Sequence, residues 1–225
     1  MLTPYAMPTT SEARRGNSRS RADIDREVDA TDQQLWDEAV AGSSAAFGLI
    51  FERHARAIYN FCFRRTGSWS VAEDLMSDVF LVAWRRRRDV AFTAEDGTVL
   101  PWLYSVALNL LRNRRRSERR ATAAFARLDP TAAQADFSDE VVGRLGDERR
   151  MRDVLSVFER LAVHEQEVLA LCVWAGLSYD DCAVALGVPV GTVRSRLARA
   201  RAHLMELVAA GGHERNGESL LGTCG

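Results

Sequence analysis

The chain contains no lysine, so arginine supplies all 30 of its basic residues. Because arginine is the only base used, a cluster of arginines is weaker evidence for nucleic-acid binding here than in most proteins. The acidic residues number 31, and the formal net charge is −1. This balance argues against a protein that coats nucleic acid indiscriminately, so the distribution of the charge becomes the informative quantity.

Cysteine is scarce, and the only four are Cys62, Cys172, Cys182 and Cys224. None forms a CxxC pair, and no nearby histidine completes a zinc-binding spacing, so we expect no metal site. The first three lie among apolar residues with helical periodicity, where a thiol usually fills a small space in the core. We favour this interpretation over redox sensing, and it suits a reducing cytoplasm. Cys224 lies in a tail that we expect to be loose.

Long hydrophobic runs are also missing. No segment is apolar over the length that a bilayer span requires, and no segment has the organisation of a secretory signal. Apolar residues never alternate with polar ones over the length of a strand, whereas helical spacing recurs. With 47% hydrophobic residues among 225 positions, the chain can build real cores. We therefore expect an all-α cytoplasmic protein without membrane insertion.

Composition predicts two small helical domains joined by a flexible linker. Helix breaks are expected near Gly42 and at Gly67, with Ser70 capping the third helix and Pro101 opening a fourth that runs to Arg120. The segments predicted are a disordered amino-terminal arm (1–30), a first helical domain (31–120), a linker (121–148), a second helical domain (149–211) and a flexible tail (212–225).

The third helix, expected from Val71 to about Arg88, carries a pair of acids. Asp74 and Asp78 lie one turn apart, on a face away from its apolar stripe. An isolated pair of this kind more often forms a solvated acidic face than a functional site. The functional alternative is a docking surface for a basic partner, and both interpretations remain open.

The fourth helix combines an apolar stripe with a polar stripe suited to nucleic acid. Asn109, Arg112 and Arg116 follow spacings of three and four residues. An asparagine amide offers a donor and an acceptor to a base edge, and arginine offers two parallel donors. From Trp102 to Arg127 there are seven arginines and one acid, whereas residues 31–52 contain four acids and no base. Separated charges of this kind predict different partners for different surfaces.

Aromatic residues flank this basic face. Phe92, Trp102 and Tyr104 lie in or near the loop expected from Phe92 to Leu100. Unpaired bases stack on aromatic rings, so aromatics beside arginines favour a site for single-stranded nucleic acid. Packing in the core at the start of the helix is an equally good interpretation of Trp102.

The segment from Leu177 to Arg201 carries the signals of a helix-turn-helix. Ser178 is placed to cap the first helix, Gly187 to end it in the left-handed conformation and Pro189 to open the second. In the second helix an apolar stripe lies opposite a polar one, and four arginines without an acid fall between residues 190 and 203. Such a helix suits the phosphates and guanine edges of a DNA major groove, although an arginine-rich solvated helix would have the same composition.

These motifs and their order along the chain resemble those of bacterial RNA polymerase sigma factors of the extracytoplasmic-function group, within the sigma-70 family. AEDLMSDVFLVAW at 72–84, PWLYSVALN at 101–109 and the arginines that follow resemble the family's region 2. LSYDD at 177–181 and LGVPVGTVRSRL at 186–197 resemble region 4. Each motif alone is moderately specific, whereas both in this order, separated by a linker, are highly specific.

The resemblance implies a specificity subunit that is not an enzyme and needs no cofactor. Its implied partners are core RNA polymerase (the clamp helices of the largest subunit and the flap), promoter DNA as duplex and as melted strand, and an anti-sigma factor. For docking on the clamp helices, the resemblance implies Asp74, Ser77, Asp78 and Trp84. For capture of the melted downstream (−10) element, it implies Phe92, Trp102, Asn109, Arg112 and Arg116. For reading of the upstream (−35) element, it implies Thr192, Arg194, Ser195, Arg196 and Arg199.

Five positions depart from the family pattern. Two of them lie in the second domain, where Ala162 replaces a proline that often starts a helix and Cys182 replaces a usual isoleucine as core filler. Ser77 stands where glutamine is usual, which puts one clamp contact in doubt, and Arg112 and Arg115 replace residues that are commonly apolar. The alternative function is a one-component helix-turn-helix regulator whose first domain is a helical sensor or dimerisation domain. A sensor needs a ligand pocket, whereas the first domain presents arginines, an asparagine and aromatics. A phosphate-handling enzyme is disfavoured, because the chain has no glycine-rich cradle and no activated nucleophile.

Overall fold

The computed structural model describes residues 30–90, 97–128 and 142–221, and every regular element in these ranges is a helix. The predicted all-α class is therefore confirmed for this part of the chain. Phe92 and residues 1–29 of the predicted amino-terminal arm lie outside the described residues. Among the residues described, no helix has the length and hydrophobicity of a membrane span.

The amino-terminal block consists of α2 (Asp32–Val40), α3 (Ser44–Thr66), α4 (Trp69–Arg86), a short 3-10 turn η1 (Arg87–Asp89) and α5 (Leu100–Leu128). Thr31 caps α2 through a reciprocal pair of hydrogen bonds with Gln34. The predicted breaks are confirmed, since Gly42 separates α2 from α3 and Gly67 ends α3. Apolar residues from all four helices fill one core, among them Trp36, Ile50, Ile58, Val79 and Leu103.

The prediction that Ser70 caps the third helix is wrong, because α4 begins at Trp69, two residues before the expected Val71, and Ser70 lies inside the helix. The Trp69 ring stacks on Phe63 with ring centroids 3.6 Å apart, and its backbone N–H donates to Glu148 Oε1 at 2.9 Å. The carboxylate accepts a hydrogen bond from a backbone N–H group in the first turn of the helix, a role that a capping serine side chain would otherwise have. Since Glu148 belongs to a distant segment, this start could not be read from local sequence.

The carboxy-terminal block consists of α6 (Val142–Phe158), α7 (Val163–Leu169), a π-helical turn η2 (Ala170–Trp174), α8 (Tyr179–Leu186) and α9 (Val190–Leu221). Ser178 caps α8 by accepting from the Asp181 N–H at 3.0 Å, and Gly187 ends it at φ +64°, as predicted. Pro189 directly precedes α9. Val193, Leu197 and Ala200 form the buried stripe of α9, which confirms the helix-turn-helix packing.

Three helices extend further than predicted. Whereas the linker was expected from residue 121, α5 continues to Leu128 through an alanine-rich stretch that favours helix. Likewise α6 begins at Val142, and α9 continues past Gly211 to Leu221 instead of ending there. The domain boundaries themselves remain predictions.

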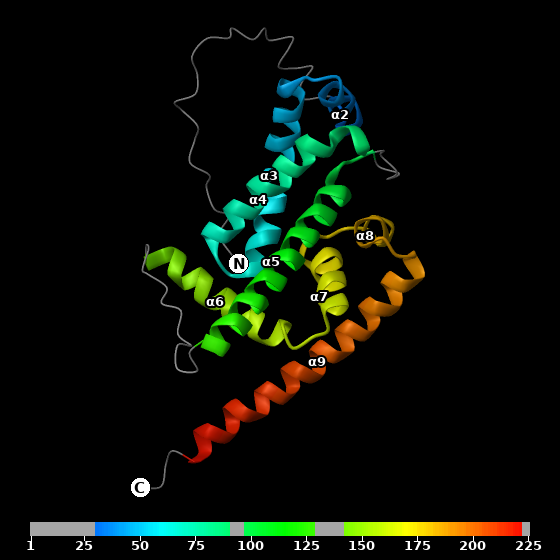
Figure 1. Cartoon of the computed structure of the whole chain (residues 1–225). Helices are drawn as coiled ribbons and strands as arrows, with labels where there is room; N and C mark the ends of the chain where they lie inside the picture. Colours follow the sequence, from blue (N-terminus) through cyan, green and yellow to red (C-terminus); the bar gives the residue numbers. More distant parts are fainter. Residues whose placement is uncertain (1–29, 91–96, 129–141, 222–225) are drawn as a thin grey trace.

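The two blocks pack against each other, with α5 passing between α3 and α4 on one side and α7 and α8 on the other (Figure 1). Gly67 lies at this junction. A Cβ there would approach Leu155 Cδ1 to 3.2 Å, so both the positive φ and the closeness of α6 favour glycine. The Arg64 guanidinium donates to the Trp174 carbonyl at 2.9 Å, which fastens α3 to η2.

Candidate nucleic-acid interface

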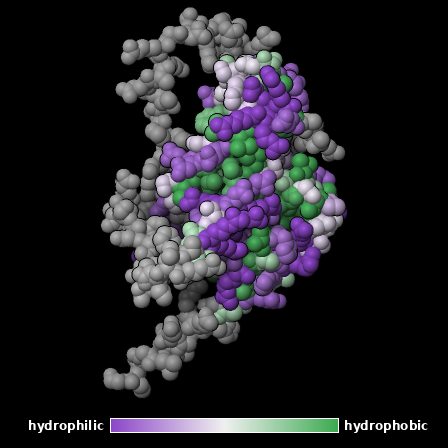
Figure 2. Space-filling model, in the orientation of Figure 1, coloured by the Kyte–Doolittle hydropathy of each residue, from purple (hydrophilic) through white to green (hydrophobic). Residues whose placement is uncertain are grey.

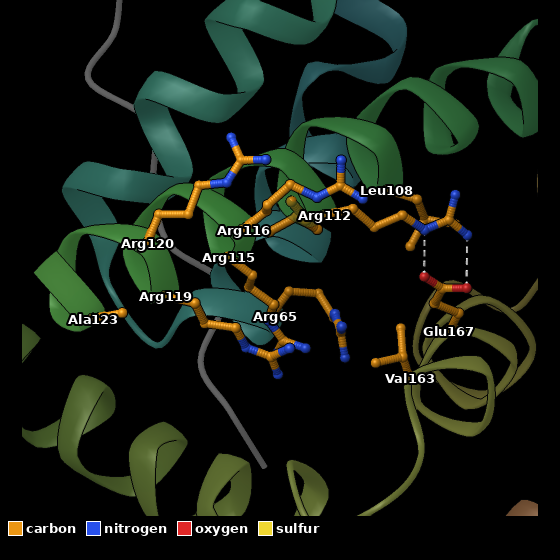
Figure 3. Close-up of a pocket in the computed structure, with 11 residues that line it drawn as sticks. Arg65, Leu108, Arg112, Arg115, Arg116, Arg119, Arg120, Ala123, Val163 and Glu167 are labelled. Carbon is orange, nitrogen blue, oxygen red and sulfur yellow. Dashed lines mark hydrogen bonds and ion pairs between the residues drawn. The ribbon is translucent and has the colours of Figure 1, made fainter.

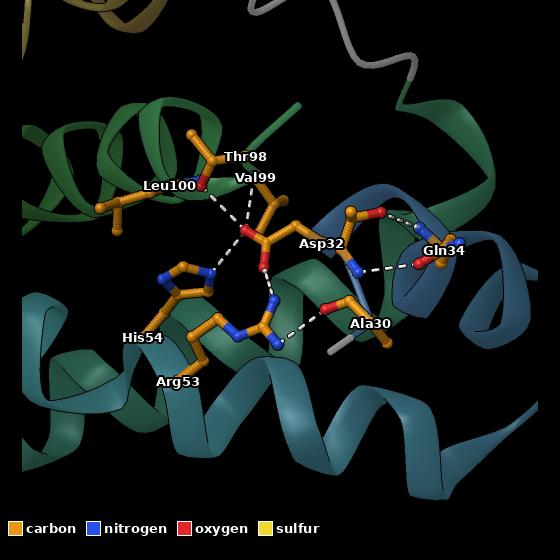
Figure 4. A network of polar contacts seen from close by, with 9 residues as sticks. Ala30, Asp32, Gln34, Arg53, His54, Thr98, Val99 and Leu100 are labelled. Carbon is orange, nitrogen blue, oxygen red and sulfur yellow. Dashed lines mark hydrogen bonds and ion pairs between the residues drawn. The ribbon is translucent and has the colours of Figure 1, made fainter. Parts of the chain in front are cut away.

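The start of α5 is held by a buried carboxylate at the start of α2 (Figure 4). Asp32 is 5% exposed and accepts from His54 Nε2 at 2.7 Å, Arg53 Nη1 at 2.6 Å and the Val99 N–H at 3.0 Å. Thr98 Oγ1 adds a fourth bond, at 2.8 Å. These bonds join α2, α3 and the residues that lead into α5, so they set where the basic helix begins.

Burial by itself would raise the pKa of Asp32, but the hydrogen bonds from His54, Arg53 and Val99 hold it well below its ordinary value. Asp32 is therefore ionised at neutral pH, and the network is intact. Sequence reasoning counted Asp32 only as one acid of the 31–52 stretch, because its partners lie on two distant segments.

The polar stripe of α5 is exposed as predicted. Asn109, Arg112 and Arg116 all reach solvent, and Arg112 Nη1 donates to Asn109 Oδ1 at 3.0 Å. Trp102 is half-buried, with its ring edge against Trp36 at 5.6 Å between centroids, so it serves mainly as packing at the start of the helix. Tyr104 is buried against Phe61, which removes it from the basic face.

Arg112 and Arg115, two of the departures from the family pattern, join the two blocks. Arg112 donates to both carboxylate oxygens of Glu167 on α7, from Nε to Oε1 at 2.6 Å and from Nη2 to Oε2 at 2.7 Å. Arg115 donates to Gln166 Oε1 at 2.8 Å and lies 3.2 Å from Glu159. The hydrogen bonds to Glu167 raise the pKa of Arg112, so the pair stays charged. Two arginines in apolar positions thus find polar partners on the opposite block, which local sequence gave no means to foresee.

These contacts border a cleft of about 440 Å³ between α5 and α7 (Figure 3). Among the described residues on its wall, six are arginines and Glu167 is the only acid. The cleft is lined by Arg65, Leu108, Leu111, Arg112, Arg115, Arg116, Arg119, Arg120, Ala123, Val163 and Glu167. Such an excess of guanidinium groups produces a positive field suited to phosphate.

Arg65 of α3 contributes to the wall of this cleft and is 4% exposed. Burial lowers its pKa to about 10, helped by the nearby charge of Arg115, so it is still protonated at neutral pH. Its terminal nitrogens reach only Gln166 Oε1, at 3.4 Å each, and its Nε has no hydrogen-bond partner among the described residues. Figure 2 shows hydrophilic residues across the middle of the molecule, where α5 passes.

The acidic pair of α4 lies on an exposed face. Asp74, Ser77 and Asp78 all point away from the core, so the structure brings these three predicted clamp-docking residues together. Trp84, the fourth predicted clamp-docking residue, is less accessible to a partner than these three. It is half-buried, with its ring 5.1 Å from Phe47 and the Arg87 guanidinium 3.8 Å above it.

The recognition helix α9 exposes most of the predicted upstream-element residues. Arg194, Ser195 and Arg199 are exposed, whereas Thr192 and Arg196 are half-buried. Arg199 Nε donates to the Ser195 carbonyl at 3.3 Å, and the Arg194 guanidinium lies 5.7 Å from the Tyr179 ring. Exposed guanidiniums on the second helix of a helix-turn-helix are placed to enter a major groove.

His203 of α9 contacts the neighbouring helix α7. Its Nδ1 lies 3.2 Å from Glu165 Oε2, while 43% of the His203 side chain remains exposed. The amide of Asn109 lies on α5 in the amino-terminal block, whereas the arginines of α9 lie in the carboxy-terminal block. They form two separate polar surfaces.

Comparison with known proteins agrees with this two-part layout. Residues 50–121 match the family model described as Sigma-70 region 2, and residues 151–204 match Sigma-70, region 4. The RNA polymerase sigma factor NccH of Alcaligenes xylosoxydans xylosoxydans is 29% identical over 182 residues, which is 80% of this chain and 95% of that protein. The ECF RNA polymerase sigma factor SigM of Mycobacterium tuberculosis is 30% identical over 179 residues, covering 79% and 85% of the two chains.

A solved structure, that of CnrH in complex with the cytosolic domain of CnrY, is also similar. It matches with a TM-score of 0.59 and 26% identity, over 80% of this chain and 97% of that one. The order of the motifs, the helix-turn-helix and these matches agree with one another. The chain belongs to the sigma-70 family of RNA polymerase sigma factors, in its extracytoplasmic-function group.

Proposed function

We propose that this chain acts in the cytoplasm as a dissociable, non-enzymatic subunit that gives core RNA polymerase its promoter specificity. The carrying observation is that one chain holds both an exposed amide-and-arginine face on α5 and an arginine-bearing recognition helix, α9. A duplex reader alone would need only the second. Together they supply upstream (−35) recognition and capture of the melted downstream (−10) strand.

The work divides between the blocks. We assign region 2 function to residues 31–120, region 4 function to residues 149–211 and the connection to residues 121–148. Asn109, Arg112 and Arg116 would hold unstacked bases and their phosphates, while Trp102 supports the start of the same helix. On α9, Arg199 has the exposure that base reading requires, with Thr192, Arg194, Ser195 and Arg196 beside it.

Core polymerase would bind both blocks. The exposed carboxylates Asp74 and Asp78 suit a basic surface such as the clamp helices, with Ser77 between them. On the other block, an apolar groove of about 430 Å³ lies between α6, η2 and α9. Its wall includes exposed Val154, Val173 and Val208, which suit an apolar segment such as the flap.

In the structure the two blocks pack against each other, and we call this the closed arrangement. It would be a resting state of the free protein. Arg112 is not free to bind a phosphate while Glu167 occupies its Nε/Nη2 edge and Asn109 accepts from its Nη1. Arg115 is engaged by Gln166 and Glu159. Binding to core polymerase would therefore separate the blocks, whereas an anti-sigma factor would hold the protein away from polymerase. The similar CnrH has been solved in complex with the cytosolic domain of CnrY, which supports the binding of a second protein partner by a chain of this kind.

Run-off transcription on genomic promoter fragments tests this function. Purified core polymerase should start at defined positions only when this protein is added, and scrambling the upstream element should abolish the product. A one-component regulator gives a different result: it binds duplex promoter DNA without core polymerase, and core polymerase plus this protein yields no new start site.

A further inference from the structure

Two cysteines on different helical elements meet inside the carboxy-terminal block. Cys172 Sγ on η2 and Cys182 Sγ on α8 are 3.0 Å apart. A disulfide joins sulfurs at ~2.05 Å, so a movement of roughly 1 Å would be enough to bond them. Their ten-residue separation does not suggest a pair. It is the π-helical turn, followed by Gly176 at φ +70°, that folds one toward the other.

The two thiols differ in accessibility. Cys182 is fully buried beneath the helix-turn-helix, whereas Cys172 is half-buried and in reach of solvent. The hydrogen bond from Cys182, helped by the charge of Arg201, lowers the pKa of Cys172. The same hydrogen bond, together with burial, raises the pKa of Cys182. Cys172 is therefore the better nucleophile, and Cys182 retains its proton.

We propose that Cys172 and Cys182 form an oxidisable dithiol, in which Cys172 reacts first with a peroxide and Cys182 resolves the product as an intramolecular disulfide. This modification site is independent of the promoter-binding function. It adds reactivity to the core-filling role expected from the sequence. Cys62 and Cys182 are both fully buried, as that role requires, and burial raises the pKa of Cys62 to about 12.

The chemistry balances with hydrogen peroxide as the oxidant. The Cys172 thiolate attacks one peroxide oxygen, the O–O bond breaks, and with one proton the leaving oxygen departs as water, leaving a sulfenic acid. The Cys182 sulfur then attacks Cys172 Sγ, its thiol proton is released to the departing hydroxyl, and a second water leaves. Two thiols and one peroxide thus give one disulfide and two waters.

The disulfide would link α8, the first helix of the helix-turn-helix, to η2, the turn that contacts the amino-terminal block. Trp174 of η2 accepts from Arg64 and stacks on Phe158 at 4.4 Å, while α8 packs directly on α9. A covalent link from Cys172 to Cys182 closes residues 173–181 into a loop and restricts their local opening. The expected signature is slower amide hydrogen exchange in that loop.

The test uses the full chain with Cys224→Ser, which removes the tail thiol from the reaction. After mild hydrogen peroxide treatment, peptide mapping should find Cys172 joined to Cys182, with the loss of two hydrogen atoms and reversal by dithiothreitol. Exchange in residues 173–181 should slow when the bond forms. Cys62 should be alkylated rapidly only after unfolding, and in the reduced, folded protein Cys172 should be alkylated about tenfold or more faster than Cys62.

Single variants test the order of reaction. With Cys182→Ala, Cys172 should stop at the sulfenic acid and be trapped by dimedone, whereas with Cys172→Ala the Cys182 thiol should stay unmodified. Hydrogen exchange of each variant reports whether the fold is kept. The proposal is overturned if peroxide leaves both thiols alkylatable, if Cys172 pairs with Cys62 instead, or if Cys182 is trapped as readily as Cys172.

Discussion

Replacing Glu167 with glutamine should loosen the closed arrangement of the two blocks. The Glu167 carboxylate is 7% exposed and accepts two charge-assisted bonds from Arg112, whose side chain is 46% exposed. Such bonds contribute ~1.5–3 kcal/mol each when shielded. The exposure of Arg112 screens them, so we expect about 1–2 kcal/mol for the pair, or roughly a 5- to 30-fold shift toward separated blocks.

Two measurements follow this shift. Small-angle scattering of the free protein should show a larger radius of gyration for Glu167→Gln than for the unmodified chain. Fluorescence anisotropy should show tighter binding of a single-stranded oligonucleotide carrying the downstream element, because Arg112 is released to bind phosphate. The gain should shrink as salt is raised.

Glu118→Gln is the matched control. It removes the 2.8 Å pair with Arg114 within α5, so it loses a surface ion pair without touching the contact between blocks. That variant should keep the radius of the original and gain far less affinity. Equal behaviour of the two variants, or an unchanged radius with Glu167→Gln, would refute the idea that this ion pair restrains the blocks.

Four further outcomes are expected. Asp78→Arg should weaken capture of core polymerase in a pull-down titration with unchanged circular dichroism, and full capture would remove the docking role from that face of α4. Arg199→Ala should cost ~1–3 kcal/mol at one base pair and relax specificity there, whereas Arg201→Ala should weaken all sequences alike; a base-substitution series that shows equal preferences for both contradicts this division. Asn109→Ala should spare holoenzyme assembly and upstream binding but lower permanganate reactivity of promoter thymines, and normal reactivity would limit this face to phosphate contact. Because the pKa of Asp32 is depressed in the fold, its stabilisation is present above about pH 4 and is lost as the pH falls toward 2, so denaturant titrations should find Asp32→Asn less stable at neutral pH and its stability flatter across that acid range.

Local signals in the sequence were enough for most helices and for the helix-turn-helix. Ser178, Gly187 and the stripe of Val193, Leu197 and Ala200 act within a few residues of their own positions. Capping, left-handed termination and helical periodicity are short-range effects, so they can be read without knowing the fold. The exposed stripe from Asn109 to Arg116 was predictable for the same reason.

The tertiary structure decided the interactions that join distant segments. Arg112 and Arg115 stand where the family commonly has apolar residues, but the fold supplies Glu167, Gln166 and Glu159 as partners. Cys172 and Cys182 looked like independent core residues, but a π-helical turn brings their sulfurs to 3.0 Å. A buried charge or thiol takes its chemistry from whatever group faces it, and that group is chosen by packing between elements, which no local pattern records.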